Sequence, residues 1–151
     1  MELLTQWILP CCWSFVACVG FSLIFNIRGK MILWSSAGGV LGWFVYLLSG
    51  FVGAGDVLQN FLAIVVIAIY AEVVARIRKA PATVFLIVAL IPLVPGGGIY
   101  YAMEYCIDGD LDQFLSTTVH TLAIAGALAL GILLVSTAVR LWNTIRRTGH
   151  L

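Results

Sequence analysis

Long apolar stretches with almost no charge fill this chain, and they restrict it to a membrane. Five such stretches follow one another, over residues 3–25, 31–53, 61–75, 84–101 and 114–141. Of the 151 residues, 62% are hydrophobic and 10% are charged, whereas soluble domains average about 45–50% and about 25%. So few charged side chains cannot cover the surface of a soluble domain of this size. The composition excludes a soluble enzyme and a disordered chain, and the net charge of +1 excludes a basic surface for nucleic acid.

The apolar stretches predict the fold class. A helix needs about 20 residues to cross a bilayer. We therefore predict an all-α, polytopic membrane protein with one domain, residues 1–151, and five transmembrane helices near residues 3–25, 31–53, 58–77, 82–104 and 114–142. The connecting loops are too short to hold a soluble catalytic domain.

The charged residues predict the orientation. In an alternating five-span topology all eight basic residues fall on one side: Arg28, Lys30, Arg76, Arg78, Lys79, Arg140, Arg146 and Arg147. The positive-inside rule then places the N-terminus outside the cell and the C-terminus in the cytoplasm. The odd span count would also allow a second module of odd span count to pair with this one in inverted topology, as in many transporters.

The fourth stretch contains a break. Helix is expected from Ala82 to about Val94, with a new half-helix from about Ile99, because proline and successive glycines end a helix. Irregular backbone at membrane depth must be buried in protein or line a wet cavity, and a half-helix N-terminus favours an anionic group such as a carboxylate. The candidate substrate-binding residues are Pro92, Pro95, Gly96, Gly97, Gly98, Tyr100 and Tyr101. The alternative is a kink or an extracytoplasmic turn without a ligand.

Four ionisable residues are candidates for ion coupling or gating. Glu72 precedes Arg76 by one helical turn, so it either carries a coupling proton or forms an interfacial ion pair. Glu104 either guards an outer mouth or is a solvated residue at a helix end. His120 lies among threonines, and either relays protons or is hydrogen-bonded near the interface.

Small residues recur at helical spacing on two of the predicted helices. Gly38 and Gly42 lie four residues apart, as do Ala123, Ala127 and Gly131. This spacing lets helix backbones approach closely, either inside the bundle or against a partner chain. The four cysteines have no metal-ligand spacing, and no catalytic constellation is visible, so we expect no metal, no cofactor and no enzymatic activity.

The segment PATVFLIVALIPLVPGGGIYYAM, residues 81–103, resembles the signature of the threonine/serine exporter family. Further similarities are GFSLIFNIRGK at residues 20–30, Gly38-Gly39-x-x-Gly42-Trp43, Glu72-x-x-x-Arg76 and the acidic loop Ile107-Asp-Gly-Asp110. The similarity is to the small subunit of the split, two-component form, which is like the C-terminal half of the family's ten-span architecture. It implies a secondary exporter in the inner membrane that works with a larger multi-span subunit. Whether this complex forms a higher oligomer is left open.

The predicted function is export of small carboxylate-bearing solutes, threonine and serine first. A dicarboxylate such as succinate is the alternative solute, since exposed amide groups would recognise any carboxylate, and a non-transporting scaffold subunit is the alternative role. The triple glycine lacks the following Lys-Ser/Thr of a nucleotide-binding loop, so an ion gradient, most simply of protons, is expected to supply the energy.

Overall fold

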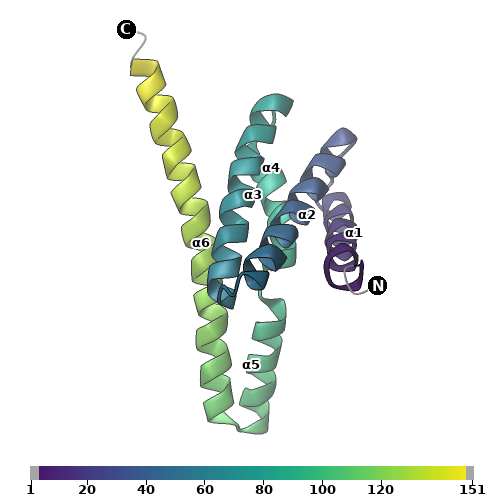
Figure 1. The fold of residues 1–151 in the computed structure, drawn as a ribbon, viewed down its shortest axis with the longest axis vertical. Coiled ribbons are helices and arrows are strands. Elements are labelled where there is room, and N and C mark those ends of the chain that lie inside the picture. The colour runs from purple at the N-terminus through teal and green to yellow at the C-terminus, as the bar shows by residue number, and fades with distance from the viewer. Residues whose placement is uncertain (1–3, 149–151) are drawn as a thin grey trace.

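The computed structural model describes residues 4–148 and builds them from helices alone (Figure 1). A π-helical turn, η1 (Leu4–Ile8), leads into α1 (Leu9–Ile24). The further elements are α2 (Lys30–Phe51), α3 (Asp56–Arg78), α4 (Ala82–Leu90), the 3-10 turn η2 (Ile91–Leu93), α5 (Gly96–Asp108) and α6 (Leu111–Thr148). The prediction of an all-α membrane protein is confirmed.

Three helices are long and apolar enough to cross a membrane: α2, α3 and residues 111–145 of α6. The segments Ala82–Leu93 and Gly96–Asp108 meet that standard together as one bent pair, so four spans can be counted. Helix α1 has 16 residues and continues directly from η1. The count of five spans remains a prediction because α1 alone is shorter than a usual span.

The break in the fourth predicted helix is present, but it lies one turn earlier than the glycines suggest. The two parts differ in direction by 47°. Pro95 is the N-cap of α5, and Gly96, Gly97 and Gly98 form its first turn, whereas the sequence placed the new start near Ile99. Proline has no N–H to extend a preceding helix, so the first segment ends before Pro95. The N–H groups in the first turn of a helix need no acceptor within it, so the glycines can form the first turn of α5.

Helix α3 forms the centre of the bundle, packed against α2, α4 and α6, while α5 packs along α6 and α1 along α2. Its buried side chains Ile64 and Ile67 fill space left by glycines on its neighbours. A Cβ at Gly42 would collide with Ile67, and one at Gly131 would collide with Ile64. Gly38 likewise faces Tyr70, so these three glycines pack inside the bundle. Ala127 is buried and Ala123 is exposed.

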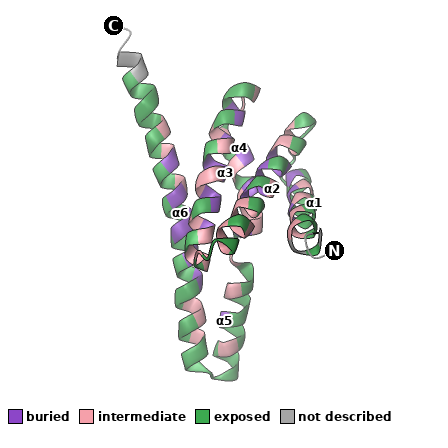
Figure 2. Ribbon diagram, in the orientation of Figure 1, coloured by how far each residue is buried: buried purple, intermediate pink, exposed green. Residues whose placement is uncertain are grey.

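Helix α6 is longer than the predicted range 114–142. The Asp110 carboxylate accepts a hydrogen bond from the Gln113 amide at 3.1 Å, a capping contact that starts the helix earlier. At about 1.5 Å per residue, its 38 residues exceed the roughly 30 Å of a bilayer core. In Figure 1 its first part forms a hairpin with α5 that extends past the ends of α2 and α3. Most of this hairpin is exposed (Figure 2).

The basic residues gather at one end of the molecule, where α2 begins and where α3 and α6 end (Figure 1). The Arg78 guanidinium lies over the Trp34 ring at 5.0 Å, and Arg76 donates a hydrogen bond to Asn143 at 3.4 Å. The opposite end holds the α2–α3 loop and the α5–α6 hairpin with their acidic residues. This separation is what the predicted orientation requires, and which end faces the cytoplasm stays a prediction.

The contact between Gly42 and Ile67 leads to a stability prediction. Gly42→Ala should lower the thermal midpoint of the protein in detergent by several degrees, because overpacking a filled core costs about 1–3 kcal/mol. Gly20→Ala is the matched control: it makes the same change inside a helix, but nothing lies within 4 Å of the new Cβ. Equal midpoints for the two variants would contradict the close approach of α2 and α3.

Candidate functional site

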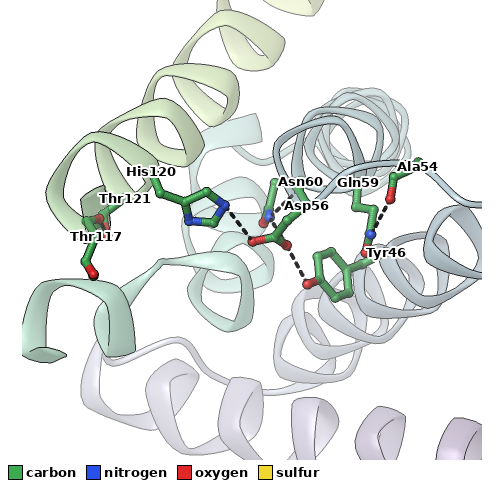
Figure 3. A network of polar contacts seen from close by, with 8 residues as sticks. All are labelled: Tyr46, Ala54, Asp56, Gln59, Asn60, Thr117, His120 and Thr121. Carbon is green, nitrogen blue, oxygen red and sulfur yellow. Dashed lines mark hydrogen bonds and ion pairs between the residues drawn. The ribbon is translucent and has the colours of Figure 1, made fainter. Parts of the chain in front are cut away.

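A pocket of about 300 Å³ lies where the helix break meets α2, α3 and α6. It is the most polar of the cavities found among the described residues, and Figure 3 shows the side chains that make it so. The lining residues are Trp43, Tyr46, Asp56, Asn60, Pro92, Leu93, Pro95, Gly98, Thr117, His120, Thr121 and Ile124. The lining therefore comes from four parts of the chain: α2, α3, the break between η2 and α5, and α6.

Asp56, the first residue of α3, is the acidic group of this pocket. The Tyr46 hydroxyl of α2 donates a hydrogen bond of 2.7 Å to its Oδ1 atom. Asn60, one turn further along α3 and 5% exposed, donates to the same oxygen at 3.3 Å and to the Asp56 carbonyl at 2.9 Å. Two donors thus hold one carboxylate oxygen and fix the direction in which the other one points.

His120 of α6 faces that second oxygen. Its Nε2 atom lies 3.6 Å from Oδ2 of Asp56, which makes an ion pair when the imidazole is protonated. The side chain of His120 is 55% exposed and that of Asp56 is 37% exposed, so both are accessible from the cavities beside them. Both residues also line a second, apolar groove of about 560 Å³ between α3 and α6. The pair is therefore a common wall of the polar pocket and this groove.

The helix break also lines the pocket, through Pro92, Pro95 and Gly98. N–H groups in the first turn of a helix have no acceptor within it, and the helix dipole makes this end favourable for anions. Gly98 packs directly on the Thr121 side chain, which a Cβ would strike. Thr121 in turn donates to the Thr117 carbonyl at 2.7 Å.

Trp43 adds a hydrogen-bond donor to the residues that line the pocket. Its ring stacks on Tyr46 with the centroids 5.3 Å apart. The indole Nε1 is buried and has no hydrogen-bond partner in the described part of the chain. A buried donor left unpaired is costly, so a ligand that accepted a hydrogen bond from it would be stabilised.

The depth of the pocket follows from the helix geometry. Roughly 20 residues separate Asp56 from Arg76 on α3 and His120 from Arg140 on α6, or about 30 Å at 1.5 Å per residue. That distance equals the thickness of a bilayer core. With the basic end at one membrane surface, the pocket lies near the other surface.

The structure brings together only part of the predicted substrate site. Pro92, Pro95, Gly98 and His120 line the pocket, whereas Gly96 and Gly97 are exposed beside it. Tyr100 and Tyr101 form an edge-to-face pair with 65% and 54% of their surfaces exposed, outside the pocket lining. Glu104 is likewise exposed on α5.

Glu72 and Arg76 lie far from the pocket and do not form the expected ion pair. The one ion pair found among the described residues joins His120 and Asp56. Arg76, near the C-terminal end of α3, instead donates a hydrogen bond to Asn143 of α6. Glu72 is half-buried in a separate groove between α3 and α6.

Tyr46, Asp56 and Asn60 are the residues that sequence reasoning missed. None of the three is among the candidate residues proposed from the sequence. The available signal was the spacing of Asp56 from Asn60, one helical turn, at the start of an apolar helix. Nothing in the sequence shows that Tyr46, ten residues earlier, folds back onto it. Within residues 4–148, no three His, Cys, Asp or Glu side chains gather as a metal site would require.

Comparison with known proteins identifies a family and distant relatives. A Haemophilus influenzae protein described as uncharacterized is 27% identical over 127 residues, covering 79% of this chain and 43% of the relative. The chain thus spans less than half the length of that relative. No solved structure matches this chain. Residues 10–138 match the family model described as "Threonine/Serine exporter, ThrE", which confirms the resemblance seen in the sequence. The chain belongs to the threonine/serine exporter family.

Proposed function

We propose that this chain is the small subunit of a secondary exporter in the inner membrane, and that threonine or serine binds in the polar pocket. Membership of an exporter family supports transport as the activity. A pocket of about 300 Å³ is at the small end of ligand sites, which range from about 300 to 1,000 Å³. The proposed solute is correspondingly small.

The observation that carries this proposal is that two features of opposite character line one small pocket. Asp56 contributes a carboxylate, and Gly98 brings in the first turn of α5, the end of a helix that favours anions. An α-amino acid at neutral pH carries an ammonium and a carboxylate on the same carbon atom. The ammonium would pair with Asp56 and the carboxylate with the first turn of α5, and a side-chain hydroxyl could bond to Trp43 or Thr117.

A dicarboxylate such as succinate is the second candidate solute. One of its carboxylates would suit the α5 terminus equally well. Its other carboxylate would meet Asp56, and like charges in a site of low dielectric repel each other. Only a protonated His120 would relieve that repulsion. The Asp56 carboxylate therefore favours a zwitterion.

The proposed partner is a larger multi-span subunit of the same family. The chain spans 43% of its longer relative, and the α5–α6 hairpin exposes apolar residues such as Met103, Ile107, Leu115 and Val119 beyond the pocket. A second subunit would cover this surface, and higher oligomers are compatible with it. In the proposed orientation the pocket lies near the outer surface of the membrane, where an exporter releases its solute.

Ion coupling is proposed because the sequence carries no nucleotide-binding loop. Protons are the simplest coupling ion, since an ionisable residue at membrane depth usually marks a substrate or proton pathway. His120 and Asp56 are such a pair.

The substrate is tested by transport with the purified two-subunit complex in liposomes. Labelled threonine and labelled succinate are compared for the native complex and for Asp56→Asn. We expect transport of threonine but not succinate by the native complex, and at least a tenfold loss in the variant, because the ammonium loses its counter-charge. Asp108→Asn, an exposed change at the end of α5, is the control. Preferred transport of succinate would contradict the proposed solute.

The role of the break is tested by two neighbouring glycines. Gly98→Val should reduce threonine export at least tenfold, because the new side chain collides with Thr121 and moves α5 from the pocket. Gly97→Val has open space around its Cβ and should retain most export. Both variants must assemble with the partner, as checked by size-exclusion chromatography. Normal export by an assembled Gly98→Val complex would favour the scaffold role.

A further inference from the structure

We infer, on the basis of the proposed function, that a proton on His120 and the ammonium group of the solute compete for Oδ2 of Asp56. This competition would couple the two movements, since the carboxylate would serve one cation at a time. Asp56 and His120 would then form the site at which proton movement is coupled to solute movement.

The two oxygens of Asp56 have different surroundings, which makes a single contested position possible. Oδ1 accepts hydrogen bonds from Tyr46 at 2.7 Å and Asn60 at 3.3 Å. Oδ2 faces the His120 ring at 3.6 Å, a separation too long for a good hydrogen bond (Figure 3). Oδ2 is thus the oxygen open to a stronger cationic partner, either the imidazolium or an ammonium group in the pocket.

Among the described residues, no other charged side chain lines either of the two cavities beside this position. Across both cavities that the pair lines, the titratable residues are Tyr46 from α2, Asp56 from α3 and His120 from α6. The break from η2 to α5 contributes Pro92, Leu93, Pro95 and Gly98, which do not titrate. Tyr46 is neutral near pH 7 and donates to the carboxylate. The charge state of the site therefore depends on His120 and on the bound solute.

The cycle balances with one proton for each solute. When a proton from water binds Nε2 of His120, the imidazolium pairs with Asp56 and no other bond forms or breaks. When that proton returns to water, neutral His120 no longer competes and the ammonium group takes its place. Ionisable residues of membrane segments usually pair with an opposite charge, and both half-cycles keep Asp56 paired. Opposite movement of proton and solute follows.

The experiment measures threonine binding to the purified two-subunit complex at pH 5.5, 6.5 and 7.5. A histidine changes its charge over this range. In the native complex the Kd should rise as the pH falls, by up to about tenfold per pH unit, the limit for one proton released per bound solute. His120→Asn should remove this dependence and bind more tightly than the native complex at pH 5.5. His120→Lys should bind weakly at every pH, because its permanent cation occupies Asp56.

The opposite effects of the two substitutions separate competition from a general loss of structure. Asp108→Asn should keep the native pH dependence, and Glu72→Gln tests the other acidic candidate. A native pH dependence in His120→Asn, or its loss in Glu72→Gln alone, would overturn the inference while leaving the proposed function intact. Failure of the native complex to bind threonine at any pH would instead refute the proposed solute, and the inference with it.

Discussion

The backbone break at Pro95 is the constraint on which the rest of the site depends. Inside a bilayer every backbone polar group needs a partner, so a broken helix is tolerated only where protein or a wet cavity surrounds it. Here α4 and η2 end against α2, while α5 starts against Thr121 of α6. The cavity beside the broken backbone is the polar pocket. Polar side chains from α2, α3 and α6 meet in this pocket.

Close glycine contacts set the dimensions of that enclosure. Ile67 of α3 packs against Gly42 of α2, and Ile64 of α3 packs against Gly131 of α6. Without a hydrophobic driving force between helices in lipid, such close packing is what holds a membrane bundle together. These two contacts hold α3 between α2 and α6 and so position its first residue. As a result Asp56 reaches both Tyr46 and His120.

Much of the fold could be predicted from sequence, because each span and its break are local properties of the chain. The apolar stretches predicted an all-α membrane protein, and the prolines predicted the interrupted helix. The start of α5 was misplaced by about one turn, since proline and glycine signals do not say which residue resumes the helix. Part of the site was found for the same local reason: Pro92, Pro95 and Gly98 lie inside one recognisable motif. Asp56 and Tyr46 were missed because their pairing depends on how α2 and α3 pack.

Coupling is most direct where the ion and the solute reach the same group, and this favours the Asp56–His120 pair over Glu72. Glu72 lies roughly 16 residues from Asp56 along α3, or about 24 Å at 1.5 Å per residue. It lines a different groove, near the basic end of the molecule. A solute in the polar pocket would not touch it, so a conformational change would have to carry the effect of its proton across most of the membrane. At Asp56 no such relay is needed, because one carboxylate oxygen faces both the imidazole and the pocket. Direct electrostatic competition at one oxygen is the shortest physical route from a proton gradient to solute movement that these residues provide.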